Sequence, residues 1–228
     1  MMIEIYRLGR IRWKTVRHRY VEEEPGLAEL EKALVFINTK LEAYGVDYVY
    51  SAGTCLGMYR DKTFIKGDDD IDVDMSIDDY KRIIEKLLNG LKEANIPFRI
   101  GEFYDYPKVS IFYMSVKISI VAQLYDKRTE MFFRNKYQVP SNLLMPSKRW
   151  EWKGISIRLP NKPEEYLKYV YGENWWTPVK WTDEDNYNNS YTVERKRSTW
   201  IGKIKSRIKS SLNNFSRQQM GIYYIFLP

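Results

Sequence analysis

The sequence contains almost none of the side chains that act through thiol or imidazole chemistry. Among its 228 residues there is one cysteine, Cys55, and one histidine, His18. A single cysteine excludes a disulfide framework and a cysteine-based zinc site, and it is typical of a reducing compartment. A single histidine excludes a metal centre built from several histidines and argues against a catalytic triad that needs histidine. Any catalysis is therefore expected to depend on carboxylates.

Long apolar segments are also absent from the sequence. No apolar run approaches the length of roughly 20 residues that spans a bilayer, and residues 1–20 lack the apolar core of a signal peptide. The Gly-Lys-Ser/Thr ending of a P-loop does not occur. With 44% hydrophobic residues, the chain is typical of one well-filled globular domain, which we expect in the cytoplasm.

Positive charge is in excess and is unevenly distributed. The net charge is +7, and basic residues gather in residues 7–19 and again in residues 195–209. In and after the second block, apolar residues recur every four positions, as Trp200, Ile204, Ile208 and Leu212. This spacing predicts a basic amphipathic helix, and we expect residues 195–212 to associate peripherally with an anionic membrane at its inner face. Calmodulin-like binding, docking on the protein's own domain and a merely solvated surface are open alternatives, and nucleic acid is a less favoured partner.

The most informative segment is a run of carboxylates. Aspartates occupy positions 68, 70, 72 and 74, and apolar residues occupy positions 71, 73 and 75. Such alternation predicts a half-buried strand with its acids on one face. Like charges this close raise each other's pKa unless a cation neutralises them. Mg²⁺ or Mn²⁺, which accept oxygen ligands, is the expected cofactor, and Asp70 and Asp72 are its candidate ligands.

Periodicity predicts the elements around this run. Helices are expected over residues 26–43, 77–93 and 163–171, and strands over residues 46–50, 98–100, 109–114, 116–125 and 152–160. The strands before and after Ser115 are expected to form an antiparallel pair. The pattern predicts one α+β domain over residues 26–181. We expect a basic arm (1–25) before it, and a linker and basic helical tail (182–228) after it.

The turn that precedes the acidic run is suited to phosphate chemistry. Gly53 and Thr54 begin a short helix whose backbone N–H groups favour a phosphate, and Arg60 and Lys62 follow as candidates to neutralise charge on a transferred group. Two carboxylates at this spacing can direct a metal pair that activates a hydroxyl and stabilises a leaving phosphate. The order strand, Gly-Thr turn, helix, acidic strand resembles the nucleotidyltransferase superfamily that includes polymerase β, and implies a mixed sheet flanked by helices.

Other interpretations of the acidic run are less favoured. An EF-hand loop begins in the same way, but its glycine at the sixth position and its glutamate at the twelfth are missing, whether counted from Asp68 or from Asp70. A nucleotide-sugar glycosyltransferase also holds metal with Asp-x-Asp on a strand, but several strand–helix units normally precede that motif. An acidic strand edge without function would leave four carboxylates uncompensated, which is costly.

Two stretches resemble one known family. Residues 53–73, which read GTCLGMYRDKTFIKGDDDIDV, resemble the signature of the LicD/fukutin phosphotransferase family, and residues 146–178 are similar to its C-terminal block. The resemblance covers roughly residues 27–180. It implies transfer of a phosphoryl-linked small alcohol, such as phosphocholine or ribitol phosphate, from a CDP-activated donor to a hydroxyl of a glycan or glycolipid acceptor. It also implies metal binding by Asp70 and Asp72 with Asp68 as a catalytic neighbour, and phosphate contacts at Gly53, Thr54 and Arg60.

The chain departs from this family at one important position. The family carries a third carboxylate on a later strand, where this chain has Ser119. A third acid helps to deprotonate the acceptor hydroxyl, so its loss implies impaired activity, a substitute such as Asp74 or Asp126, or a shifted alignment. Two alternatives to the phosphotransferase therefore stay open: a catalytically impaired or binding-only protein of the same fold, and a nucleotidyltransferase acting on another macromolecule.

The second stretch is rich in tryptophan. Trp150, Trp152, Trp175 and Trp176 can form a wall for a choline-like cation or a sugar ring. Packing in the core is the favoured interpretation, because aromatic residues at this density usually fill cores.

Overall fold

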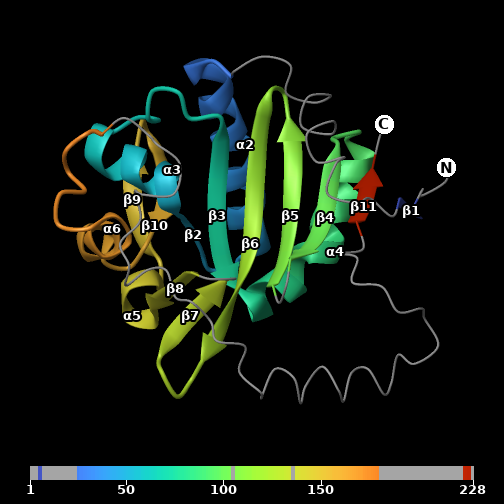
Figure 1. Cartoon of the computed structure of the whole chain (residues 1–228). Coiled ribbons are helices and arrows are strands. Elements are labelled where there is room, and N and C mark those ends of the chain that lie inside the picture. Colours follow the sequence, from blue (N-terminus) through green and yellow to red (C-terminus); the bar gives the residue numbers. More distant parts are fainter. Residues whose placement is uncertain (1–4, 7–24, 104–105, 135–136, 180–222, 227–228) are drawn as a thin grey trace.

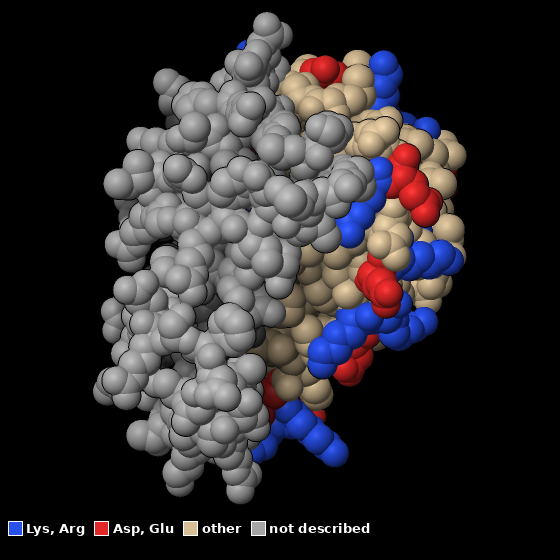
Figure 2. Space-filling model, turned by 90° about the vertical axis from the view of Figure 1, so that its right-hand side faces the viewer, with Lys and Arg blue, Asp and Glu red and all other residues tan. Residues whose placement is uncertain are grey.

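In a computed structural model, the described part of the chain comprises residues 5–6, 25–103, 106–134, 137–179 and 223–226 (Figure 1). The amphipathic helix predicted within residues 195–212 lies outside these ranges, as do His18 and most of the predicted arm and linker. Within the described ranges, no helix is both long enough and apolar enough to cross a membrane. The face seen in Figure 2 carries basic and acidic side chains in alternation over its described residues, without a large area of one sign.

Two long helices form the layer behind the sheet in Figure 1. Helix α2 spans Leu27–Tyr44 and ends at Gly45, whose φ of 65° places it in the left-handed region that favours glycine. Helix α4 spans Ile77–Glu93 and begins at Ser76, whose hydroxyl accepts a hydrogen bond of 3.0 Å from the N–H of Asp79. Both helices confirm the predicted ones within a residue or two.

A mixed sheet forms the other layer. Its strands follow the order β1-β11-β4-β5-β6-β3-β2, with β7 and β8 attached at the end of β6. The bounds are β1 Ile5–Tyr6, β2 Tyr48–Tyr50, β3 Asp70–Ser76, β4 Phe98–Phe103, β5 Tyr106–Tyr113, β6 Val116–Asp126, β7 Met131–Arg134, β8 Tyr137–Pro140 and β11 Tyr223–Phe226. Strands β3 and β6 pair in parallel, and every other pair within this sheet is antiparallel. The predicted fold class, an α+β mixed sheet flanked by helices, is confirmed.

The core lies between the sheet and the two long helices. Ile71, Val73 and Met75 on β3 are fully buried, and they belong to one apolar cluster with Leu34 of α2 and Leu87 of α4. Because side chains alternate along a strand, this leaves the acidic residues of β3 on the opposite face of the sheet. Short segments from the predicted arm and tail, β1 and β11, extend the sheet at its far edge beyond β4.

A small subdomain packs at the other end of the sheet. It contains helix α5 (Ser141–Leu144), a hairpin of β9 (Lys148–Trp152) and β10 (Ile155–Leu159), and helix α6 (Pro163–Tyr171). The sequence predicted one strand over residues 152–160, whereas the structure has a hairpin. Its turn is made by Lys153 and Gly154, with φ of 46° and 80°, as two-residue hairpin turns require. Arg158 of β10 donates hydrogen bonds to Glu42 of α2, which ties the hairpin to the main layers.

Candidate functional site

The turn after β2 is built on tight backbone packing. Helix α3 (Ala52–Leu56) runs directly into a π-helical turn, η1 (Gly57–Asp61). A Cβ atom at Gly57 would lie only 2.5 Å from the carbonyl oxygen of Thr63, so the chain can fold back here only because residue 57 is glycine. At the start of α3, Ala52 has a φ of 49° and its N–H donates to the hydroxyl of Tyr166, 3.2 Å away on α6.

This turn holds the backbone of Asp72 from both sides. The N–H of Ser51 donates to the carbonyl oxygen of Asp72 (3.0 Å), and the N–H of Asp72 donates to the hydroxyl oxygen of Thr54 (3.0 Å). Thr54 is buried, so its observed contact positions the acidic strand. Gly53 lies against the carboxylate of Asp68, because a Cβ there would meet both carboxylate oxygens at 3.4 Å. The phosphate contacts predicted for Gly53 and Thr54 stay predictions.

The acidic strand and its two neighbours present a regular array of side chains on the face of the sheet away from the core. The parallel register of β3 with β6 and the antiparallel register of β6 with β5 define three rows. The rows are Asp70–Lys117–Phe112, Asp72–Ser119–Ser110 and Asp74–Val121–Lys108. The predicted alternation along β3 is therefore confirmed, and Asp70 and Asp72 share one face.

Three basic side chains face the three acids of this array. Lys117 forms an ion pair with Asp70 at 2.5 Å, and Arg134 of β7 pairs with the buried Asp74 at 3.2 Å. Lys108 is half-buried. Burial lowers the pKa of its ammonium group, and the attraction of Asp72 opposes that shift. The sequence interpretation missed these cations, although the same alternation that places Ser119 on this face also places Lys117 there.

Asp68 and Asp72 are acids of this site whose pKa is raised. Burial raises the pKa of Asp72 to about 6, and the neighbouring charge of Asp70 adds to this effect, while Arg134 and Lys108 oppose it. Burial, followed by repulsion from Asp70 and Asp72, raises the pKa of Asp68 to about 7. One carboxylate oxygen of Asp68, Oδ2, is buried without a hydrogen-bond partner. A bound cation would therefore suit these carboxylates better than the metal-free site does.

Ser119, where the sequence comparison predicts that an acid is missing, lies beside the candidate ligands. Ser119 is the register partner of Asp72, it is fully buried, and its hydroxyl has no hydrogen-bond partner. Asp74 is already paired with Arg134, and Asp126 lies at the far end of β6, where it accepts a hydrogen bond from the N–H of Arg128. In the described part of the chain, no group of three or more histidine, cysteine or acidic side chains is arranged to hold a metal ion. Asp70 and Asp72 remain the candidate ligand pair.

The two cations predicted to contact phosphate have partners of their own. The guanidinium of Arg60 donates two hydrogen bonds to Asp61, at 2.8 and 2.7 Å, and one of 3.4 Å to the carbonyl oxygen of Trp175. The ammonium of Lys62 donates to the carbonyl oxygen of Tyr59 (2.7 Å) and lies 4.8 Å from the centre of the Trp150 ring. Their roles toward a phosphate stay predictions.

The tryptophans divide between core and surface. Trp152 and Trp175 are buried, as the favoured interpretation predicts, and the indole N–H of Trp152 donates to the carbonyl oxygen of Lys62 (2.9 Å). Trp176 is 63% exposed. The cation found over Trp150 is the protein's own Lys62.

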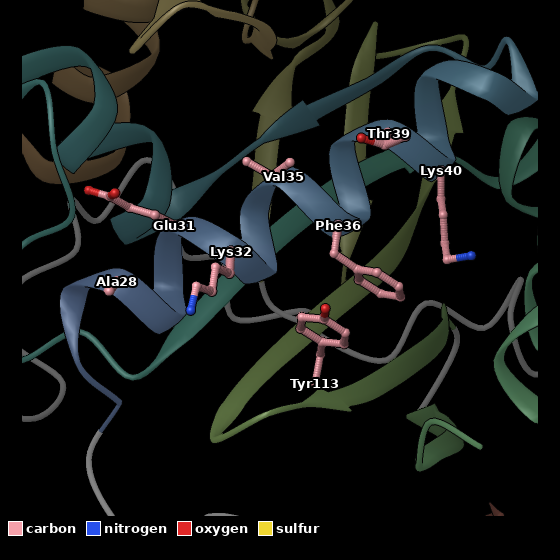
Figure 3. A pocket seen from close by; sticks show the side chains of 8 residues that line it. All are labelled: Ala28, Glu31, Lys32, Val35, Phe36, Thr39, Lys40 and Tyr113. Atoms are coloured by element: carbon pink, nitrogen blue, oxygen red, sulfur yellow. The ribbon is translucent and has the colours of Figure 1, made fainter. Parts of the chain in front are cut away.

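A separate hollow lies on the outer side of α2. It has a volume of about 670 Å³, and Figure 3 shows that side chains of α2 and Tyr113 line it. Phe36 stacks on Tyr113 with ring centres 4.1 Å apart. None of the candidate site residues lines this hollow, so we do not assign the chemistry to it.

The strand, turn, helix and acidic strand, with both candidate ligands on the face of a mixed sheet away from the long helices, define a domain of the nucleotidyltransferase type. Residues 45–162, slightly more than half of the chain, match the family described as "LicD/FKTN/FKRP, nucleotidyltransferase domain". The chain belongs to this family.

Curated relatives agree with this assignment. The ribitol-5-phosphate transferase FKTN of Homo sapiens is 26% identical over 156 residues, and that of Mus musculus is 28% identical over 156 residues. Each match covers 63% of this chain but only 32% of the relative, so the chain spans less than a third of these proteins.

Solved structures with some likeness are antibiotic-modifying enzymes. The lincosamide antibiotic adenylyltransferase LnuA, bound to lincomycin, is 14% identical with a TM-score of 0.43, over 60% of this chain and 84% of its own. ANT(2")-Ia in complex with adenylyl-2"-tobramycin is 15% identical with a TM-score of 0.43, over 79% and 90% of the two chains.

Proposed function

We propose that the chain is a metal-dependent phosphotransferase. It would move a phosphoryl-linked small alcohol from a CDP-activated donor to a hydroxyl of a glycan or glycolipid. The observation that carries the proposal is the pair Asp70 and Asp72, on the same face of β3, with the buried oxygen of Asp68 nearby. Family membership and the ribitol-5-phosphate transferases among the relatives support the choice of reaction.

Asp70 and Asp72 would hold Mg²⁺ or Mn²⁺, since both ions bind carboxylate oxygen. When bound, such an ion neutralises the carboxylates and stabilises negative charge on phosphate oxygens. Ser51 and Thr54 fix the backbone of Asp72, so they set the direction of its carboxylate. Asp68 would accept the proton of the acceptor hydroxyl, because burial, the largest cause of its raised pKa, also makes its carboxylate a stronger base when the ion is bound.

The contacts of Trp150 favour an uncharged polyol over choline as the transferred alcohol, although the exposed Trp176 still offers an aromatic face. A quaternary ammonium group needs a free aromatic face, and the Trp150 ring already holds the ammonium of Lys62 at 4.8 Å. A polyol phosphate does not need such a face. The relatives named for ribitol-5-phosphate transfer point in the same direction.

The test is a direct assay of the reaction. The full chain would be incubated with Mg²⁺, a glycan acceptor and CDP-ribitol, CDP-choline or a nucleoside triphosphate. We expect CMP release and a new phosphodiester with CDP-ribitol, abolished by EDTA and by Asp70→Asn. Pyrophosphate release from a triphosphate would instead identify a nucleotidyltransferase. CDP binding without turnover for any acceptor would identify the binding-only alternative.

We also retain the predicted membrane association and cytoplasmic location as part of this proposal. The buried free thiol of Cys55 is compatible with a reducing compartment. The test uses a full-length variant in which glutamine replaces Lys203, Lys205, Arg207 and Lys209. Unlike a truncation, this variant retains the residues of β11. This variant should no longer co-sediment with anionic liposomes. The wild type should bind anionic liposomes and should not bind neutral ones. Equal sedimentation of the two proteins would refute the association.

A further inference from the structure

On the face of the sheet away from the two long helices, a row of small side chains lies between acidic and basic residues. Ser119 of β6 and Ser110 of β5 are register partners, and both lie in the row that begins with Asp72. Both serines are buried, at 0% and 2% exposure. The Ser119 hydroxyl has no hydrogen-bond partner, so it can donate to a ligand placed over the row.

Two lysines flank this serine row from opposite ends. Lys117 is two residues before Ser119 on β6, and Lys108 is two residues before Ser110 on β5. Because β5 and β6 are antiparallel, the lysines come from opposite directions along the strands. Lys108 interacts electrostatically with Lys117 as well as with Asp72, so the two ammonium groups and the acids share one site.

A bound divalent cation would change the charge balance on this face of the sheet. Asp70, Asp72 and Asp74 supply three negative charges, which three basic side chains match: Lys108, Lys117 and Arg134. Asp68 lies beside them as a further carboxyl group, and a divalent cation held by Asp70 and Asp72 would shift the balance of the face toward positive charge. It would also compete with Lys117 for Asp70, because the carboxylate oxygen bound by Lys117 is a candidate ligand atom. The displaced ammonium would then need another anion.

We propose that Lys108 and Lys117, with the Ser119 hydroxyl between them, form a subsite for the diphosphate group of a nucleoside diphosphate. The identity of this ligand as the donor rests on the proposed function, but the binding of the anion does not. The two lysines lie on either side of Ser119 along the strands, and their ammonium groups attract phosphate oxygens as point charges.

Isothermal titration calorimetry tests the subsite. It measures the binding of CDP and of inorganic pyrophosphate to the full chain, once in EDTA and once in Mg²⁺. Lys108→Met should weaken CDP binding at least tenfold in both conditions, whereas Lys108→Arg should stay within threefold of wild type. Lys81→Met, on the exposed surface of α4, removes the same charge and should leave the affinity unchanged. Unfolding temperatures without ligand identify any variant that fails to fold.

Lys117→Met has a signature that a structural role would not give. It should weaken CDP binding in Mg²⁺ but tighten Mn²⁺ binding, measured by electron paramagnetic resonance, because Asp70 loses its competing partner. Unchanged CDP affinity in folded Lys108→Met would overturn the subsite. Intact, lysine-dependent CDP binding without CMP release would keep the subsite and overturn the proposed reaction, so the two failures are distinguishable.

Discussion

Asp72→Asn should abolish phosphotransfer and, at the same time, make the metal-free protein more stable at pH 8. Transfer should fall at least about 100-fold, because the variant loses half of the candidate ligand pair and the charge that acts in the transition state. The gain in stability follows from the raised pKa of Asp72, about 6 in the folded protein against an ordinary value of 3.8. Function and stability are therefore opposed at this residue.

The sign of the stability effect follows from proton uptake. A carboxyl group with a higher pKa in the folded state takes up a proton on folding, so it stabilises the fold fully below pH 3.8. That contribution is lost as the pH rises through about 6. At pH 8 wild type in EDTA should be less stable than Asp72→Asn by about 1–3 kcal/mol. Adding Mg²⁺ should increase the stability of the wild type but not that of Asp72→Asn.

Urea unfolding at pH 5 and pH 8, in EDTA and in Mg²⁺, measures these differences. Glu85→Gln on the exposed surface of α4 is the matched control, and it should show neither the activity loss nor the Mg²⁺-dependent difference. A variant Asp72→Asn that is active, or that is less stable than wild type at pH 8 in EDTA, would contradict the assignment of Asp72.

Gly57→Ala should destabilise the protein by about 2–3 kcal/mol, an effect typical of overpacking at a closed site. The added Cβ would meet the carbonyl oxygen of Thr63 at 2.5 Å, and backbone atoms cannot yield as a flexible side chain does. Relieving this clash requires the segment from η1 to Asp68 to move, so phosphotransfer activity should fall as well.

The control for this change is another glycine. Gly90 lies within α4 and would place its Cβ in open space, with nothing within 4 Å. Gly90→Ala should therefore stabilise the protein by about 0.5–1 kcal/mol, because alanine loses less conformational entropy in a helix. Denaturant unfolding of both variants gives the comparison. Equal stabilities of the two variants would mean that the backbone packing at residue 57 can accommodate a Cβ atom.

The local elements of the fold were predictable from the sequence because their signals are local. Ser76 marks the start of α4, and Pro163 and Gly172 bracket α6, as capping preferences predict. The pairing around Ser115 is also confirmed, although its turn lacks a glycine and uses Met114 at a φ of 56°. The hairpin of β9 and β10 was only half predicted, because its first strand is mostly exposed and lacks apolar alternation.

The candidate site was predictable in its acids and not in its bases. Asp68, Asp70 and Asp72 stand out because they occupy alternate positions of one short motif. Lys108 and Lys117 are separate in the sequence, and only the register of three strands brings them to the acids. Thr54 illustrates the same limit: its place in the Gly-Thr turn predicts a phosphate contact, but only the tertiary structure reveals the hydrogen bond from the backbone of Asp72 to its hydroxyl.

The parallel pairing of β3 with β6 has a consequence for the order in which the chain folds. The hairpin of β5 and β6 closes through a short turn, so it can form early and already carries both lysines of the site. The contact between β3 and β6 spans residues 70–123, and closing that longer loop is slower. We therefore expect the acidic strand to dock onto a hairpin that already carries Lys108 and Lys117. In that order, Asp70 would meet the ammonium group of Lys117 as it leaves water.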